Sequence, residues 1–318
     1  MLSLHTNNAA LSAQNSIAKT QSTLSTSMTR LSTGYRINSA MDDAAGLQIA
    51  SRLKAQTSGM TVAMRNTQNS TSMLQTAEGA LDEVSNMLIR MKDLATQAAD
   101  ASSTADDKTA MQAEFDALGK ELANVMKNTT FGGKTLLEGT DAVEGDADKG
   151  IEAVAAKPGT LMEKMTFQIG ASASETMEID LKSDMDGLVE ALEKATGTYS
   201  TPGTAGTELV GTEGEEVDGV AGPRVETANA TITLLATALD KVGTVRSGLG
   251  AAANRLEHVH NNLANISTNT KAATGQIMDV DFATESANMT SNQMLLQAST
   301  AMLKQSNSMS SMVMSLLQ

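Results

Sequence analysis

The chain has 318 residues, a formal net charge of -14, no Cys, no Trp and only 2% aromatic residues. Because large aromatic side chains dominate ordinary globular cores, this composition argues against a globular enzyme and favours long helices packed through Leu, Met and Ala. The absence of Cys excludes disulfides, thiol nucleophiles and zinc sites with cysteine ligands.

The first helix is expected within residues 1–41, a stretch that contains no acidic residue. Its apolar side chains recur at helical spacing, which is typical of a helix that packs against other helices. This apolar set consists of Leu4, Leu11, Ile17, Leu24, Met28 and Leu31. Neither terminus has the basic start and continuous apolar run of a secretory signal peptide, and no apolar run is long enough to span a membrane.

Two pairs of residues predict where the next helices begin. Ser39 with Asp42 fits a capping box that would start a helix from about residue 42 to about residue 99. Thr104 with Asp107 fits a second capping box, and the helix that follows is expected to end near Lys127. A short polar turn joins the two helices, so we expect an antiparallel helical hairpin.

The middle of the chain has a different periodicity. Apolar and polar residues alternate in residues 165–169 and 177–181, on either side of a polar turn, which predicts a β-hairpin. Residues 186–195 are compatible with a short helix, residues 199–223 with a loop or a very small outer lobe, and helical spacing returns from about residue 225 to about residue 266. The predicted fold class is therefore mainly α with a small β-hairpin region. Long N- and C-terminal helices would form a coiled-coil or bundle core around a β-rich middle and a short variable surface segment.

The net charge is confined to the middle. Residues 138–228 contain 20 acidic and 6 basic residues, whereas residues 1–137 have 12 of each and residues 229–318 have 5 of each. Like charges repel at every repeated contact, so the neutral ends suit packing against identical copies and the acidic middle suits exposure to solvent. The chain has no basic patch with interleaved aromatic residues, which argues against nucleic-acid binding.

Residues 276–318 contain no Gly or Pro and are predicted to form one long helix. Its apolar side chains follow a seven-residue spacing, and the other positions are mostly uncharged and polar. The row consists of Leu295, Met302, Met309 and Leu316, with Met312 a half-period further on and Leu296 and Leu303 beside it. A helix without charges on the face opposite its apolar row is expected to contact protein on several sides. We therefore expect the two terminal helices to pair and neighbouring copies to cover them.

The candidate chemical motifs do not reach the pattern that their chemistry requires. Residues 128–135 end in Gly-Lys-Thr like a phosphate-binding loop, but Asn128 stands where the motif needs Gly. His258 and His260 lie about 200° apart around a helix, so one metal ion cannot easily use both. We therefore predict no catalytic, cofactor-binding or metal site, and no enzyme activity.

Four motifs, in order along the chain, resemble bacterial flagellin. They are residues 31–46 (LSTGYRINSAMDDAAG), 130–136 (TFGGKTL), 248–256 (GLGAAANRL) and 315–318 (SLLQ). The resemblance covers roughly residues 1–137 and 229–318 and, weakly, the expected hairpin. It implies a structural subunit that self-polymerises into the flagellar filament for motility, that is secreted to the extracellular flagellum, and whose terminal helices fold on assembly.

The resemblance also implies a division into five segments. These are residues 1–41, an N-terminal inner-core helix and linker; 42–181, a helical hairpin plus β-hairpin; 182–224, a short variable surface segment; 225–275, a C-terminal outer-core helix and linker; and 276–318, a C-terminal inner-core helix. The division places the variable part on the surface and both termini inside.

The implied partners are copies of the chain in a helical homopolymer, a flagellin export chaperone, the flagellar type III export apparatus, and the filament cap and hook-junction proteins. Residues 89–97 (IRMKDLATQ) resemble the segment recognised by the Toll-like receptor for flagellin, which implies Arg90, Leu94 and Glu114 as receptor contacts. Two alternatives stay open: a flagellin-like hook-filament junction protein, and a secreted coiled-coil adhesin or effector.

Overall fold

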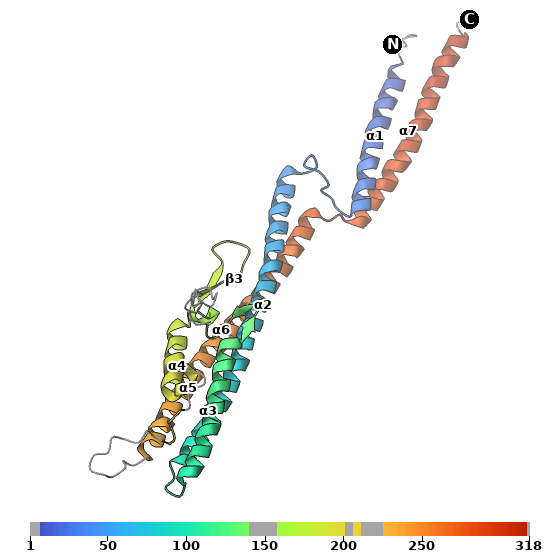
Figure 1. The fold of residues 1–318 in the computed structure, drawn as a ribbon. Helices are drawn as coiled ribbons and strands as arrows, with labels where there is room; N and C mark the ends of the chain where they lie inside the picture. The colour runs from blue at the N-terminus through green and yellow to red at the C-terminus, as the bar shows by residue number, and fades with distance from the viewer. Residues whose placement is uncertain (1–6, 140–157, 201–205, 211–224, 317–318) are drawn as a thin grey trace, which may run out of the picture. The chain divides into compact units, whose positions relative to one another are not determined.

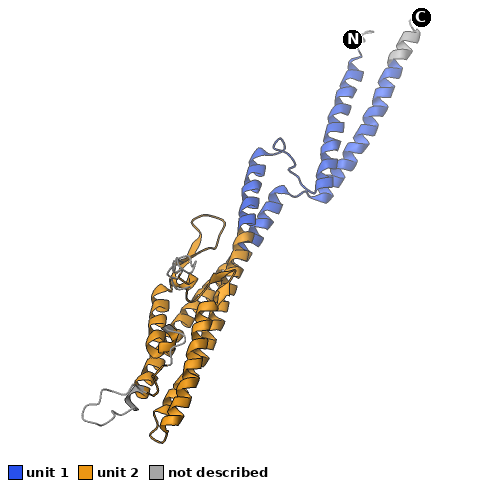
Figure 2. Cartoon of the chain, viewed as in Figure 1, with its two compact units in different colours: residues 1–59, 265–318 blue, residues 60–264 orange. Residues whose placement is uncertain are grey.

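The computed structural model describes residues 7–139, 158–200, 206–210 and 225–316 (Figure 1). This part is mainly helical with two small antiparallel hairpins, which confirms the predicted fold class. The chain forms two compact units: unit 1 contains residues 1–59 and 265–318, and unit 2 contains residues 60–264 (Figure 2). The boundary falls inside two long helices, α2 (Ala44–Ala98) and α6 (Val225–Met278), so the five-segment division stays a prediction.

Unit 1 contains the terminal helices α1 (Asn8–Thr33) and α7 (Phe282–Leu316), which lie side by side (Figure 1). The Asn7 side chain accepts a hydrogen bond from the Ala10 amide at 3.1 Å and caps the start of α1. Gly34 ends the helix with a φ of 76°, and its amide donates to the Arg30 carbonyl at 2.9 Å. Glycine adopts this left-handed conformation without steric cost, which fixes where the first predicted helix stops.

The last helix is shorter than predicted. Helix α6 continues to Met278, residues 279–281 leave the helical conformation, and α7 begins at Phe282. Asp281 caps the new start: its carboxylate accepts from the Ala283 amide at 3.1 Å and from the Thr284 hydroxyl at 2.6 Å. A short polar side chain that binds neighbouring groups in this way competes with a continuous helix. The prediction of one unbroken helix from residue 276 is therefore wrong.

The predicted pair of Ser39 and Asp42 forms, but it does not start the second helix. Asp42 accepts hydrogen bonds from the Ser39 amide at 2.9 Å and from the Ser39 hydroxyl at 3.2 Å, which closes a tight turn. Helix α2 begins two residues later, where the Asp43 carboxylate accepts from the Gly46 amide at 2.8 Å. Asp43 thus supplies the N-terminal cap.

Unit 2 packs α2, α6 and α3 (Ala105–Asn128) around one hydrophobic core. Asp82 of α2 and Arg246 of α6 form an ion pair of 3.0 Å between two of these helices. The 3-10 helix η1 (Thr160–Met162) and the hairpin of β3 (Met165–Gln168) and β4 (Thr176–Ile179) also contribute to the core, which confirms the predicted hairpin. The largest fully buried side chains in the core of unit 2 are Tyr199, Phe115, Leu74, Leu81, Leu88, Met91, Leu122, Met126, Leu136, Leu137, Leu161 and Met185.

A second, smaller hairpin pairs β1 (Thr130–Phe131) with β2 (Lys134–Thr135). The two residues between the strands, Gly132 and Gly133, have φ values of 60° and 83°. A two-residue turn of type I′ requires positive φ at both positions, which explains the glycine pair. The Gly-Gly-Lys-Thr sequence that resembles a phosphate loop therefore serves a tight turn.

Helix α4 (Lys182–Ala195) confirms the predicted short helix but belongs to the core of unit 2. Met185, Leu188 and Leu192 are fully buried on one of its faces. The next helix, α5 (Gly197–Ser200), buries Tyr199, whose hydroxyl donates to the Glu138 carboxylate. These side chains pack α4 into the core, although it lies in the predicted surface segment of residues 182–224.

The structure confirms the predicted capping box at the start of α3. The hydroxyl and amide of Thr104 donate to Asp107, and both hydrogen bonds lower the pKa of that carboxyl. A lowered pKa in the folded state adds stability that is present above the ordinary pKa and is lost as the pH falls through the lowered value. The substitution Thr104→Ala should raise the pKa of Asp107 toward its ordinary value, measured by NMR titration of the carboxyl.

The internal control for this titration is Asp100, whose pKa is lowered by a hydrogen bond from the Ser102 side chain. Its titration should be the same in the wild-type chain and in Thr104→Ala. An Asp107 titration that also stays unchanged would show that the Thr104 hydroxyl does not stabilise the carboxylate.

Candidate functional site

The terminal helices of unit 1 meet along a seam whose positions alternate at three- and four-residue steps, as in a coiled coil. The side chain at each seam position is less exposed than the side chains on the outward-facing positions of the same helix. On α1 they are Ala10, Ala13, Ile17, Thr20, Leu24, Ser27 and Leu31, and on α7 they are Glu285, Met289, Asn292, Leu296, Ser299, Leu303 and Ser306. More than half of these residues are Ala or polar. The seam therefore allows close approach but offers little apolar surface.

Burial within the seam is shallow. Among the side chains of α1 and α7 that the structure describes, only Ser27 and Glu285 are buried, at 5% and 7% exposure. In that same set no Leu, Ile or Met is fully buried. Most of the stability of a helix in a protein comes from packing of its apolar face. The isolated pair lacks the burial that stabilises unit 2.

A second set of apolar side chains on the two helices points away from the seam. We call it the outward stripe, and its members are 48% to 70% exposed. It consists of Leu11, Met28, Met294, Leu295, Met302 and Met309. On α7 its four members fall within an arc of about 100°, centred about 110° from the seam. Exposed apolar side chains gathered on one face of a helix in this way are typical of a protein interaction surface.

The structure thus divides the predicted apolar sets. Of the residues predicted for assembly, Ile17, Leu24 and Leu31 lie in the seam, and Leu11, Met28, Leu295, Met302 and Met309 lie in the outward stripe. Leu296 and Leu303, predicted to lie beside the main row, instead take seam positions. Two apolar rows stand one residue apart on α7, and periodicity alone cannot decide which row faces α1. Met312 and Leu316 lie in α7, and Leu4 lies outside the described residues.

Polar contacts that the sequence analysis missed hold both ends of the seam. At one end, the side-chain amide Nδ2 of Asn7 donates to the Ser306 carbonyl, and the Ser306 hydroxyl donates to Asn7 Oδ1, both at 3.3 Å. At the other end, Arg30 lies 3.9 Å from Glu285 and 4.0 Å from Asp42. The only sequence signal for these contacts is a heptad spacing of polar residues, which becomes visible only when the partner helix is known.

The connections that lead into the two terminal helices are joined by backbone hydrogen bonds within unit 1. The Arg36 amide donates to the Met278 carbonyl at 2.6 Å, and the Val280 amide donates to the Gly34 carbonyl at 3.0 Å. The Arg36 guanidinium also donates to the Ile277 carbonyl at 2.8 Å. These bonds place the end of α1 beside the start of α7 and fix the register of the seam.

The residues predicted to contact the innate immune receptor lie in unit 2. The Arg90 guanidinium donates to the Glu114 carboxylate at 2.6 and 2.9 Å, and the two side chains are 55% and 46% exposed. Leu94, by contrast, is 3% exposed and belongs to the hydrophobic core. Core residues therefore cover the Leu94 side chain in this structure, and its role as a receptor contact stays a prediction.

Two findings bear on other kinds of site. Within the described ranges, no group of three or more His, Asp or Glu side chains is arranged to hold a metal ion. No helix in the same ranges combines the length and the hydrophobicity needed to cross a membrane. The candidate functional surface in the described residues is therefore the outward stripe, which suits contact with protein.

Comparisons with known proteins identify the family. Residues 4–142 match the bacterial flagellin N-terminal helical region, and residues 232–317 match the bacterial flagellin C-terminal helical region. The chain is 34% identical to polar flagellin F of Vibrio parahaemolyticus, with 99% of both chains covered. It is 36% identical to flagellin C of Vibrio cholerae, with 96% of both covered.

Among solved structures, the fold resembles a putative flagellar hook-associated protein from Vibrio parahaemolyticus, with a TM-score of 0.51, 16% identity, and 75% of this chain and 100% of that chain covered. At this identity the likeness concerns the fold alone. The flagellin family matches and the flagellin relatives do not favour the hook-filament junction and adhesin alternatives. Because both terminal regions and full-length relatives match, the chain belongs to the bacterial flagellin family and is a structural subunit of the flagellar filament.

Proposed function

We propose that α1 and α7 complete their folding during polymerisation, when the outward stripe packs against other copies of the chain. The observation that carries this proposal is the lack of any fully buried Leu, Ile or Met among the described side chains of the two helices. Helix formation in water is marginal without such packing. Neighbouring copies supply the missing apolar contacts, so folding and assembly stabilise each other.

The charge distribution supports the same proposal. After Glu285 the sequence contains one charged side chain, Lys304, in the remaining 33 residues. A helix surrounded by copies of itself brings like charges together at every contact, so a nearly neutral helix assembles without that repulsion. The acidic residues 138–228 are consistent with a solvent-facing part of the subunit.

The substitution Met302→Asp tests the proposal at the most exposed member of the outward stripe, which is 70% exposed. Burial of an unpaired carboxylate costs several kcal/mol, so the critical concentration for polymerisation should rise by at least about tenfold. The matched control is Met302→Leu, which conserves volume and hydrophobicity and should polymerise like the wild-type chain. Sedimentation of seeded reactions measures both. Equal critical concentrations for the Asp and Leu variants would contradict burial of the stripe.

The same surface supports a proposal about the partners that the family resemblance implies. An unassembled subunit with an exposed apolar stripe is prone to aggregate. We therefore propose that an export chaperone covers the C-terminal helix before secretion through the flagellar type III export apparatus. We further propose that the filament cap and hook-junction proteins meet the same helices at the ends of the filament.

We also propose Arg90 and Glu114 as contacts for the Toll-like receptor for flagellin, which rests on the resemblance of residues 89–97. Each of the substitutions Arg90→Ala and Glu114→Ala should weaken the response of reporter cells to the monomer. An exposed ion pair contributes at most about 1 kcal/mol, so both variants stay folded. The matched control is Lys164→Ala, which breaks an ion pair of 2.7 Å with Glu178 whose side chains are 55% and 56% exposed. An unchanged response to both Arg90→Ala and Glu114→Ala would remove the proposal.

A further inference from the structure

The outward stripe contains an unusual share of thioethers. On α7, three of its four members are methionines: Met294, Met302 and Met309 are 60%, 70% and 56% exposed. Thioethers are soft and adaptable, which suits packing between copies. They are also the only apolar side chains in the stripe that mild oxidants attack, because Leu has no comparable reactive atom.

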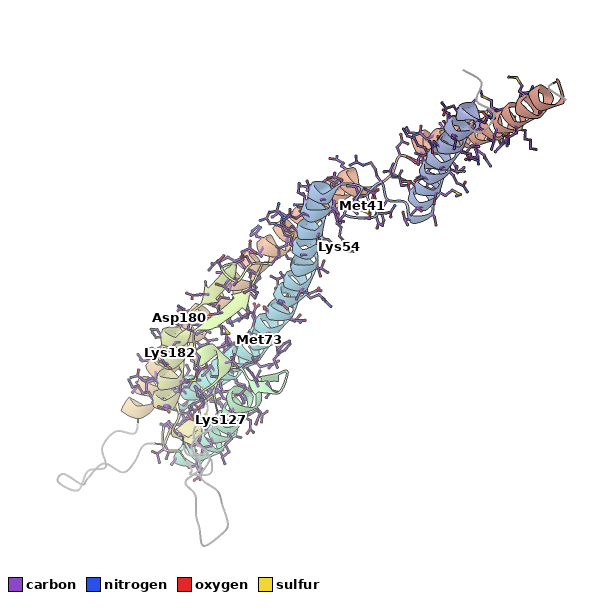
Figure 3. All side chains as sticks on the ribbon, turned by 90° about the horizontal axis from the view of Figure 1, so that it is seen from above. Met41, Lys54, Met73, Lys127, Asp180 and Lys182 are labelled. Carbon is purple, nitrogen blue, oxygen red and sulfur yellow. The ribbon has the colours of Figure 1, made fainter. Side chains whose placement is uncertain are left out.

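Methionines elsewhere in the chain differ sharply in exposure and supply internal references. Met91, Met126 and Met185 in the core of unit 2 are fully buried. Met41 is 96% exposed in the loop before α2 and lies outside the stripe (Figure 3). Oxidant should therefore reach Met41 and the three stripe methionines of α7 well before it reaches the core.

We propose that Met294, Met302 and Met309 form an oxidation-sensitive site that controls polymerisation: the subunit assembles with thioethers and is blocked as the sulfoxides. The oxidant class is a peroxide. Hydrogen peroxide transfers one oxygen atom to the sulfur, so an S–O bond forms, the O–O bond breaks and water leaves. The sulfur loses two electrons and the peroxide gains them. A sulfoxide is polar and accepts hydrogen bonds, so it opposes burial against an apolar surface.

The inference rests on the proposed function, because oxidation matters here only if the stripe is buried on assembly. The inference also states when oxidation acts, before or after assembly. A free subunit is vulnerable at these three positions, and an assembled subunit is shielded by its neighbours. Reduction by the two methionine sulfoxide reductases, one for each epimer, should restore a blocked subunit.

The test uses the full-length chain treated with hydrogen peroxide, peptide mapping by mass spectrometry to locate sulfoxides, and seeded polymerisation followed by sedimentation. We expect sulfoxide at Met294, Met302 and Met309 to form at least about tenfold faster than at Met91 and Met126. The critical concentration of the oxidised chain should rise at least about tenfold and return after reductase treatment. The variant M28L/M294L/M302L/M309L, which also removes the stripe methionine of α1, should polymerise equally before and after peroxide. Met41→Leu should remain as sensitive as the wild-type chain.

Failure of the inference and failure of the proposed function give different results. If the untreated wild-type chain does not polymerise, the proposed function is wrong. If it polymerises equally well with the three sulfoxides in place, or if the fourfold Leu variant is as sensitive as the wild-type chain, the inference is wrong. Oxidation of wild-type filaments provides a second measurement in case the fourfold Leu variant fails to assemble. In these filaments Met294, Met302 and Met309 should oxidise at least about tenfold more slowly than in monomers. Equal rates would also overturn the inference.

Discussion

Deletion of residues 293–318 should abolish filament growth while leaving unit 2 folded. The deletion removes Met294, Leu295, Met302 and Met309, which form the whole α7 part of the outward stripe, together with four of the seven α7 seam positions. Burial of about 200 Å² of apolar surface stabilises a contact by about 5 kcal/mol, and each subunit repeats that contact with several neighbours. Loss of this contribution is larger than any single side-chain effect expected elsewhere in the chain.

The same deletion leaves the core of unit 2 intact, because every described member of its hydrophobic clusters lies between residues 60 and 263. Negative-stain electron microscopy and sedimentation measure polymerisation, and circular dichroism with thermal unfolding measures the fold. The full-length chain purified in parallel is the control. Long filaments from the truncated chain would show that the C-terminal helix does not drive assembly.

The substitution Phe115→Ala should have the largest effect on the stability of unit 2. Phe115 is fully buried in α3, and the chain has only four Phe and no Trp, so few other side chains fill comparable volume. Truncation of a buried Phe lowers the free energy of unfolding by about 3–5 kcal/mol through lost burial and the cavity left behind. That is a large share of the roughly 5–15 kcal/mol that stabilises a typical domain.

Phe282 provides a control with the same chemical change. It lies at the start of α7 and is 58% exposed, so Phe282→Ala removes no core contact of unit 2 and should change the free energy of unfolding by less than about 0.5 kcal/mol. Urea unfolding of the monomeric chain, followed by circular dichroism, compares the two variants. Equal midpoints would mean that Phe115 does not support the core as its burial indicates.

Much of the fold can be predicted from local sequence signals. The capping box of Thr104 and Asp107, the alternation in residues 165–169 and 177–181, and the seven-residue spacing in α7 each specify an element through nearby residues. The break at residues 279–281 is harder to predict, because Asp281 caps a new helix inside an otherwise regular apolar pattern. Side-chain competition of this kind depends on one residue rather than on periodicity.

The candidate site could be predicted only in part, since it depends on which face of each helix finds a partner. The sequence shows two adjacent apolar rows on α7, and only the pairing with α1 assigns Leu296 to the seam and Leu295 to the outward stripe. The same holds for Leu94. Arg90 and Glu114, predicted with it as receptor contacts, are exposed, but the core of unit 2 covers the Leu94 side chain. Burial is set by contacts between distant segments, which one sequence does not reveal.

Amide hydrogen exchange along residues 8–33 and 282–316, compared between dilute monomer and filament, tests coupled folding most directly. If the terminal helices depend on neighbouring copies, these amides should exchange rapidly in the monomer, those in the core of unit 2 should exchange slowly, and the terminal amides should become protected in the filament. Strong protection of both terminal helices in the dilute monomer would contradict the account.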